Sequence, residues 1–352
     1  MTAVLIVDDS ALMRKHLSTL FKDAGMQVRT VGNGADAVQE VLANPPDVIT
    51  LDVNMPQMDG LTALSQIMAA RPTPVVMVSS LTAKGTMATL EALAMGAVDF
   101  IEKPGGTISL SMDTVSKELV AKVRAAARAR LRPTPAASRP EMPARTRPAP
   151  KPAPPVTRAP GLPDGLVIIG ISTGGPRTLE DVLPLLPGRL RWPVLVVQHM
   201  PAAFTAPLAA RLNKFCELEV GEAAQFDPIQ RGRVYIAKGG TDLAVGVRNG
   251  VLVAINKPES PRHHWHPSVD VLVASALEVM PPDRIVGVQM TGMGSDGADT
   301  MTELKRRGGR TIAESEESSV VFGMPRELIE RGGATVVLPS RSVAAKIIEW
   351  VK

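Results

Sequence analysis

Short apolar runs alternate with helical patterns over the first third of the chain. Five runs of strand length recur: AVLIVDD at 3–9, MQVRTV at 26–31, DVITLD at 47–52, PVVMVSS at 74–80 and DFIEKP at 99–104. Segments with helical periodicity fit between them, and TVSKELVAKVRAAARARL at 114–131 predicts a final helix. Strands that alternate with helices in this way predict a (βα)5 domain of the α/β class, with a doubly wound parallel sheet covered on both faces.

The alternation resumes near residue 164 in a second α/β pattern. Its strand-like runs are LVIIGIS at 166–172, PVLVVQH at 193–199, RVYIA at 233–237, RIVGVQMTG at 284–292, TIAES at 311–315 and TVVLP at 335–339. The segment LAVGVRNGVLVAIN interrupts them, and Asn249-Gly250 at its centre predicts an antiparallel hairpin. We therefore expect a second doubly wound parallel sheet with one hairpin inserted.

A proline-rich stretch separates the two patterns. Residues 132–160 hold ten of the 31 prolines and almost no large apolar side chains, so this stretch cannot bury a core and predicts an extended linker. The expected division is a first domain at 1–125, a helix end and linker at 126–163, and a second domain at 164–352.

Charge and composition narrow the class of protein. A hydrophobic fraction of 45% with 21% charged residues is typical of a soluble globular chain. The pI of 9.3 suggests a polyanionic partner. However, residues 132–160 carry six basic residues against one acidic residue, while the whole chain has a net charge of +4, so the remainder is close to neutral. With only 3% aromatic residues to stack on bases, nucleic-acid binding is not supported.

Features that the sequence lacks predict the cellular location of the protein and whether it can form a disulfide. No apolar run approaches the length of a membrane span, and MTAVLIVDDS lacks the basic region and cleavage site of a signal peptide, so we expect a cytoplasmic protein. The single cysteine, Cys216, excludes an intrachain disulfide. We interpret it as a small buried hydrophobe rather than a nucleophile.

Polar side chains gather at the strand ends of the first domain. Asp8 and Asp9 end the first run, Asp52 the third, Ser79 and Ser80 the fourth, and Lys103 the fifth. Aspartate and serine after a strand often cap the next helix, but the carboxyl ends of parallel strands are also where chemistry gathers. Three carboxylates together repel one another and favour a hard cation such as Mg²⁺. The set predicts a carboxylate that can carry a phosphoryl group.

The pieces VDDS, LDVNMPQMDG, VVMVSSLT and GAVDFIEKP resemble a response-regulator receiver domain over residues 1–125. The resemblance implies that Asp52 is the phosphoacceptor and that a histidine kinase of chemotaxis is the phosphodonor. It places Mg²⁺ among Asp8, Asp9 and Asp52, with the carbonyl of Asn54 as a further ligand.

The same resemblance assigns supporting roles around the phosphoryl group. Ser79 takes the position of the switch hydroxyl, Lys103 contacts the phosphate, and Phe100 is the aromatic switch residue. A cis bond is expected before Pro104.

The segment IGISTGGP at 169–176, near the start of the second domain, predicts a strand end followed by a glycine-rich turn. It lacks the spacing of a dinucleotide or phosphate loop but satisfies G-x-S-x-G, the turn that exposes a nucleophilic serine. Pro176 suits the first turn of a helix, whose N–H groups favour an oxyanion near Ser172. A hydrolase, an anion-binding loop and a structural turn all remain open on this motif alone.

A nucleophilic serine needs a base and a group that orients it. His199 ends the next strand and so reaches the same sheet edge as Ser172. Asp296, in QMTGMGSDGADT, either caps the following helix or receives the imidazole N–H, while the backbone near Met293 supplies an oxyanion donor. Chain order leaves open a second triad of Ser172, Asp242 and His264.

The histidines of PRHHWHPS, His263, His264 and His266, raise the alternative of a metal site. Their spacing matches no standard zinc pattern, and we expect no acidic ligands beside them.

Further pieces of the second domain resemble the catalytic domain of the chemotaxis protein-glutamate methylesterase over residues 165–350. They are IGISTGGP, VVQHMPAAFTAPLAARLN, HPSVDVLVASA, TGMGSDGA and GRTIAESEESSVVFGMPREL. The resemblance implies a triad of Ser172, His199 and Asp296, with the Met293 N–H as oxyanion donor. Lys238 and the loop at 262–266 depart from the family pattern and concern substrate contacts.

The resemblance implies a phosphorylation-regulated serine hydrolase of sensory adaptation. Its substrates are glutamate γ-methyl esters of methyl-accepting chemoreceptors, with methanol released, and receptor glutamines are deamidated by the same path. Mg²⁺ serves the receiver only, and neither nucleic acid nor membrane insertion is expected. Two other classes remain as alternatives: a receiver with a DNA-binding output, and a phosphorylation-controlled binding module with an inactive hydrolase fold.

Overall fold

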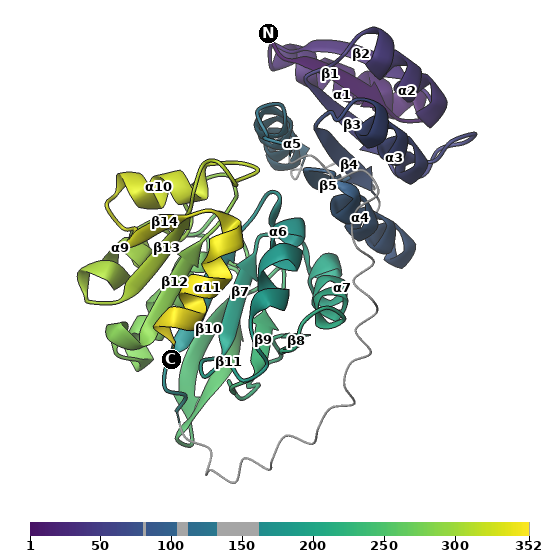
Figure 1. Ribbon diagram of the computed structural model, residues 1–352. Helices are drawn as coiled ribbons and strands as arrows, with labels where there is room; N and C mark the ends of the chain where they lie inside the picture. The colour runs from purple at the N-terminus through teal and green to yellow at the C-terminus, as the bar shows by residue number, and fades with distance from the viewer. Residues whose placement is uncertain (80–81, 104–111, 132–161, 352) are drawn as a thin grey trace.

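The computed structural model describes residues 1–79, 82–103, 112–131 and 162–351 of the 352-residue chain. The predicted linker at 132–160 and the bond before Pro104 lie outside the described residues. The described chain forms two α/β units, each built on a parallel sheet (Figure 1). Both predicted fold classes are confirmed, whereas the boundaries at 125 and 163 stay predictions.

The first unit is a five-stranded parallel sheet in the order β2-β1-β3-β4-β5. Its strands are β1 (Ala3–Val7), β2 (Gln27–Val31), β3 (Val48–Asp52), β4 (Val75–Ser79) and β5 (Asp99–Glu102). Its helices are α1 (Ala11–Asp23), α2 (Gly34–Ala43), α3 (Gly60–Ala70), α4 (Ala83–Met95) and α5 (Met112–Ala126). Every residue of β3 and β4 is buried, as the helices on both faces require.

The final helix of this unit is shorter than the apolar pattern predicts. We expected it to run to Leu131, but α5 ends at Ala126 and the chain turns through Arg128. The N–H of Arg130 then bonds the carbonyl of Val320 in the second unit at 3.2 Å. A contact with the other unit therefore replaces the last helical turn.

The second unit is a seven-stranded parallel sheet in the order β14-β13-β12-β6-β7-β9-β8. Its strands are β6 (Leu166–Ile171), β7 (Val194–Gln198), β8 (Glu219–Glu222), β9 (Arg233–Ile236), β12 (Ile285–Gln289), β13 (Arg310–Glu314) and β14 (Val336–Leu338). Its helices are α6 (Gly175–Val182), α7 (Ala202–Asn213), α8 (Val269–Val279), α9 (Ala298–Arg306), α10 (Met324–Glu330) and α11 (Ser340–Trp350). The sequence pattern missed β8, a short edge strand whose residues EVGE lack a strand-like apolar run.

The predicted hairpin is confirmed as β10 (Asp242–Arg248) and β11 (Val251–Lys257), a separate antiparallel pair. Asn249 and Gly250 have φ values of 52° and 76°, the left-handed pair that a two-residue hairpin turn requires. The hairpin is tied to α8, because the N–H of Val245 bonds the Ser275 hydroxyl at 3.0 Å.

The two units touch where β5 and the residue before it meet the turn that follows β6. The Thr173 hydroxyl donates to the Asp99 carboxylate at 2.6 Å, and the Gly174 N–H donates to the Val98 carbonyl at 3.1 Å. The rings of Phe100 and Phe204 lie 4.2 Å apart between centroids. None of the helices in the described ranges has both the length and the apolar character needed to cross a membrane.

Candidate functional site

Ser172 lies at the centre of the second sheet, directly after β6. Its N–H donates to the Thr291 carbonyl at 2.9 Å, which joins it to the loop after β12. Gly174 follows at φ 77° as the N-cap of α6, and Pro176 stands in the first turn of that helix, as predicted. The serine is 7% exposed. The turn thus holds a hydroxyl at the helix N-terminus, on the edge where the strand ends meet.

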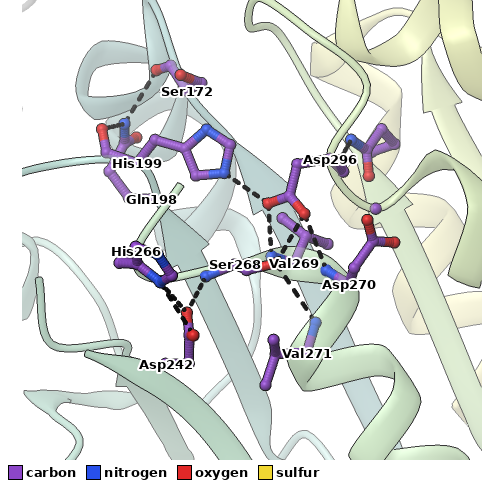
Figure 2. Close-up of polar contacts among 12 residues, drawn as sticks. Ser172, Gln198, His199, Asp242, His266, Ser268, Val269, Asp270, Val271 and Asp296 are labelled. Atoms are coloured by element: carbon purple, nitrogen blue, oxygen red, sulfur yellow. Dashed lines mark hydrogen bonds and ion pairs between the residues drawn. The ribbon is translucent and has the colours of Figure 1, made fainter. Parts of the chain in front are cut away.

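His199 follows β7, beside Ser172 at the same edge. Its Nε2 lies 2.8 Å from the Asp296 Oδ2, and the imidazole stands between Ser172 and Asp296 (Figure 2). Its Nδ1 is buried and has no hydrogen-bond partner within the described parts of the chain. Because Nε2 faces the carboxylate, Nδ1 is the nitrogen that remains to accept a proton.

Asp296 caps a helix, but not the one that follows it. The N-cap of α9 is Gly297, so the interpretation of Asp296 as the cap of α9 is wrong. Its carboxylate instead meets the start of α8, where it accepts from the Val269 N–H at 2.7 Å and the Ser268 hydroxyl at 2.8 Å (Figure 2). Burial opposes the charge of Asp296, but hydrogen bonds from His199 and from the helix N–H groups outweigh it and lower its pKa to about 2.

Two buried glutamines, which the sequence analysis missed, hold the backbone of these residues. The Gln198 side-chain amide donates to the carbonyls of Ser172 and His199 at 3.0 and 3.1 Å. The Gln289 amide donates to the Asp296 carbonyl at 2.7 Å. Each glutamine is the last residue of its strand, so a polar residue that ends a buried strand was the available signal.

The loop that carries Met293 lies against Ser172. A Cβ at Gly292 would stand 2.6 Å from the Ser172 Cβ and 2.4 Å from the Met324 Sδ, so only glycine allows this approach. Met293 is half-buried, and among the described residues its N–H donates no hydrogen bond. The predicted oxyanion donor thus lies on a loop that contacts Ser172 and has an N–H with no acceptor among the described residues.

The second possible triad does not assemble. Asp242 pairs with His266, whose Nδ1 lies 3.0 Å from both of its carboxylate oxygens, and it also accepts from the Ser268 N–H at 2.9 Å. His264 instead meets the edge of Trp265. The order Ser172, Asp242, His264 is therefore wrong, and Asp242 serves to anchor the loop.

The expectation that no acids lie beside the histidine cluster is also wrong. Ligand atoms of His263, Asp270 and Asp296 all lie within 4.8 Å of one another. The cluster is nonetheless a poor metal site, because both oxygens of Asp296 already accept two hydrogen bonds each. Burial, with added repulsion from Asp296, raises the pKa of Asp270.

The first unit brings its acidic cluster together as predicted. Ligand atoms of Asp8, Asp9 and Asp52 lie within 4.8 Å of one another at the ends of β1 and β3. Lys103 Nζ lies 2.6 Å from Asp52 and 3.1 Å from Asp8. The contact with Asp8 is made to its buried Oδ2, so the one ammonium is shared between two carboxylates. One ammonium does not neutralise three carboxylates, so the cluster favours a hard cation. This set of oxygen donors fits Mg²⁺.

Electrostatics make Asp52 the distinctive member of this cluster. Burial raises the pKa of Asp52, and the neighbouring Asp8 adds to the rise while Lys103 opposes it. Burial disfavours the charge of Lys103, but hydrogen bonds and attraction from Asp52 and Asp8 outweigh it and raise its pKa. The backbone of Asn54, whose N–H lies 3.3 Å from Asp52 Oδ1, borders the same site.

The remaining predicted residues lie between this site and the second unit. Ser79 ends β4 in a buried position, with its hydroxyl 3.4 Å from the Gly85 carbonyl. Phe100 is buried on β5 and packs on Phe204 of α7. Far from both sites, burial raises the pKa of the half-buried Cys216 to about 12, which argues against a nucleophilic thiol.

Comparison with known proteins agrees with this two-part geometry. The sequence profile described as "CheB methylesterase" matches residues 167–347, and the profile "Response regulator receiver domain" matches residues 4–112. A protein of Rhodospirillum rubrum named "Protein-glutamate methylesterase/protein-glutamine glutaminase 3" is 53% identical, over 100% of this chain and 96% of its own. The chain belongs to the CheB methylesterase family.

Family members from other organisms are similar to this chain as well. An Archaeoglobus fulgidus protein with the name protein-glutamate methylesterase/protein-glutamine glutaminase is 45% identical, over 99% of this chain and 98% of its own. The crystal structure of the Thermotoga maritima CheB methylesterase catalytic domain is 41% identical. That structure covers 53% of this chain and 98% of its own, with a TM-score of 0.52. A related catalytic domain is thus known as a separate folded unit.

Proposed function

We propose that this CheB-family protein is a phosphorylation-regulated serine hydrolase that cleaves glutamate γ-methyl esters on chemoreceptors and releases methanol. The observation that carries the proposal is the 2.8 Å bond between His199 and Asp296, at the sheet edge where Ser172 follows β6. The names of the relatives support the substrate and add deamidation of receptor glutamines. The cytoplasmic location stays a prediction.

The proposed reaction uses the triad for proton transfer. His199 Nδ1 takes the Ser172 proton as Oγ attacks the ester carbonyl, while the Asp296 carboxylate holds the opposite N–H and stabilises the imidazolium. The imidazolium returns the proton to the leaving methoxide, so methanol departs and an acyl-enzyme remains. Water then gives a proton to His199 and attacks the acyl group, and the imidazolium returns that proton to Ser172 Oγ as the bond to the glutamate breaks. With a glutamine substrate, ammonia leaves in place of methanol.

Backbone dipoles would stabilise the tetrahedral intermediate. The Met293 N–H faces no acceptor in the described chain, and the N-terminus of α6 begins immediately after the nucleophile turn. A negative oxygen near Ser172 is favoured by both features. Removing one such donor typically costs about a hundredfold to a thousandfold in kcat.

The receiver would act through phosphorylation of Asp52 by a histidine kinase of the chemotaxis system. Asp8, Asp9, Asp52 and the carbonyl of Asn54 would hold Mg²⁺, which neutralises charge on the incoming phosphoryl group when it is bound. Lys103 would contact the phosphoryl oxygens from the position it occupies beside Asp52.

The contacts of β5 support obstruction as the form of control. Asp99 and Val98 hold Thr173 and Gly174, the two residues after the nucleophile, and Phe100 covers Phe204. Phosphorylation of Asp52 is proposed to loosen this contact through Ser79 and Phe100. The receiver would then expose Ser172 to a receptor helix.

The chemistry is tested by methanol release from methylated chemoreceptor in membranes, with the full chain, Mg²⁺ and a small phosphodonor. Ser172→Ala is expected to lose the activity by orders of magnitude, whereas Ser342→Ala on the distant α11 keeps the wild-type rate. A wild-type protein that releases no methanol, and whose Ser172 is not labelled by a fluorophosphonate, would instead be a phosphorylation-controlled binding module. If the intact chain shifts the electrophoretic mobility of DNA in a salt-dependent way, the DNA-binding alternative is supported.

A further inference from the structure

The loop PRHHWHPS places an aromatic side chain directly on the proposed base. The Trp265 ring lies 5.0 Å from the His199 ring between centroids, at an interplanar angle of 9°. His264 also meets the indole in a T-shaped arrangement, with centroids 4.8 Å apart at 80°. We propose that Trp265 is a positioning residue that fixes the ring plane of His199 and keeps its Nδ1 directed at Ser172.

The need for such a residue follows from the bonds of His199. The only hydrogen bond to its ring in the described chain joins Nε2 to Asp296. Rotation about Cβ–Cγ moves Nδ1 farther than Nε2, so this single bond holds Nε2 but leaves the direction of Nδ1 weakly determined. A flat indole at 9° fixes that rotation, because a tilted imidazole would collide with it.

The loop is anchored well enough to do this. The next residue, His266, is bonded to the buried Asp242, and the Ser268 N–H bonds the same carboxylate. The indole Nε1 also lies 3.7 Å from where a Cβ at Gly294 would stand. Trp265 is therefore close to both the proposed base and the loop of Met293.

The stacking contact would also strengthen when His199 becomes positively charged during the reaction. An indole face attracts a cation within about 6 Å of its centre. The contact therefore grows stronger as His199 takes the proton from Ser172. This inference rests on the proposed function, because it assigns Trp265 a role only through His199.

The test compares variants of the full chain, with Mg²⁺ and phosphodonor, in two assays. Trp265→Leu removes the flat ring, Trp265→Phe keeps one, and Trp350→Leu makes the same change at another half-buried tryptophan on α11. The first assay is kcat and KM for methanol release, and the second is the rate at which a small fluorophosphonate labels Ser172. Thermal unfolding identifies any variant that fails to fold.

We expect Trp265→Leu to lower kcat and the labelling rate about tenfold, with KM within twofold of wild type. Trp265→Phe should recover most of the loss, and Trp350→Leu should match wild type. In a His199→Ala background, Trp265→Leu should cost nothing more, since it acts through the base.

Three outcomes would overturn the proposal. These are wild-type labelling of Ser172 in a folded Trp265→Leu variant, a change confined to KM, and an undiminished cost in the His199→Ala background. Failure of the proposed function itself looks different, because wild-type Ser172 would then not be labelled at all.

Discussion

Asp99→Ala is expected to activate the unphosphorylated enzyme without touching either reactive site. Asp99 accepts the Thr173 hydroxyl at 2.6 Å across the contact between the units, in a buried position. Its other oxygen accepts from the Phe100 N–H at 2.8 Å and lies 3.4 Å from Lys122 Nζ. The substitution therefore removes one hydrogen bond to a charged group at the contact.

A hydrogen bond to a charged group contributes about 1.5–3 kcal/mol. At about 1.4 kcal/mol per factor of ten, this changes the balance between covered and uncovered Ser172 by roughly tenfold to a hundredfold. The bond from Gly174 to Val98 and the packing of Phe100 on Phe204 remain, so the gain should lie near the lower value. Activation by phosphodonor should shrink by the same factor.

The assay is initial methanol release from methylated chemoreceptor, without phosphodonor, at equal protein concentration. Glu118→Ala is the matched control, because Glu118 also lies 3.4 Å from Lys122 Nζ but belongs to the receiver helix α5. Phosphorylation of Asp52 should persist in both variants, which shows that the receiver is folded. If Asp99→Ala stays at the wild-type unphosphorylated rate while residues 161–352 alone are faster, the Asp99–Thr173 bond does not hold the receiver in place.

Three further predictions concern the two sites. His199→Ala should lose about as much methanol release as Ser172→Ala, and combining them should cost little more, since triad members act as a unit; additive losses would contradict the triad. Phosphorylation of Asp52, followed with a radioactive small phosphodonor, should fail in EDTA and weaken in Asp9→Ala; an unchanged yield in EDTA would mean that no cation is needed. Because the pKa of Asp296 is lowered in the folded protein, its charge contributes stability above the ordinary pKa of 3.8, and this stability is lost as the pH falls toward about 2. Asp296→Asn should therefore reduce the free energy of unfolding, measured by urea denaturation, more at pH 7 than at pH 2. Equal losses at both pH values would show that the charge of Asp296 carries no such stability.

Sequence reasoning predicted the elements that depend on local patterns. Buried strands such as β3 and β4 are continuous apolar runs, and Asn249-Gly250 specifies its own turn. The strand-end position of His199 also placed it near Ser172, because parallel strands end at one edge. These features need only neighbouring residues or the topology of a parallel sheet.

What the sequence could not predict depends on contacts between distant segments. The edge strand β8 is formed by pairing with β9 rather than by its own residues. The helix α5 ends early because Arg130 pairs with Val320. Asp296 looks like the cap of the helix that follows it, yet it accepts from the start of α8, some 27 positions earlier. No local pattern contains that partner.

We expect the receiver to restrain the Ser172 esterase until Asp52 is phosphorylated. The most direct measurement is initial methanol release from methylated chemoreceptor membranes by the full chain, by Asp52→Ala and by residues 161–352, each with and without phosphodonor and Mg²⁺. We expect residues 161–352 to be active without phosphodonor, the full chain to reach a comparable rate only with it, and Asp52→Ala to stay near the basal rate. A hundredfold gain would correspond to about 2.7 kcal/mol between the two states. If residues 161–352 are no faster than the unphosphorylated full chain, obstruction is wrong and the receiver must activate the catalytic domain directly.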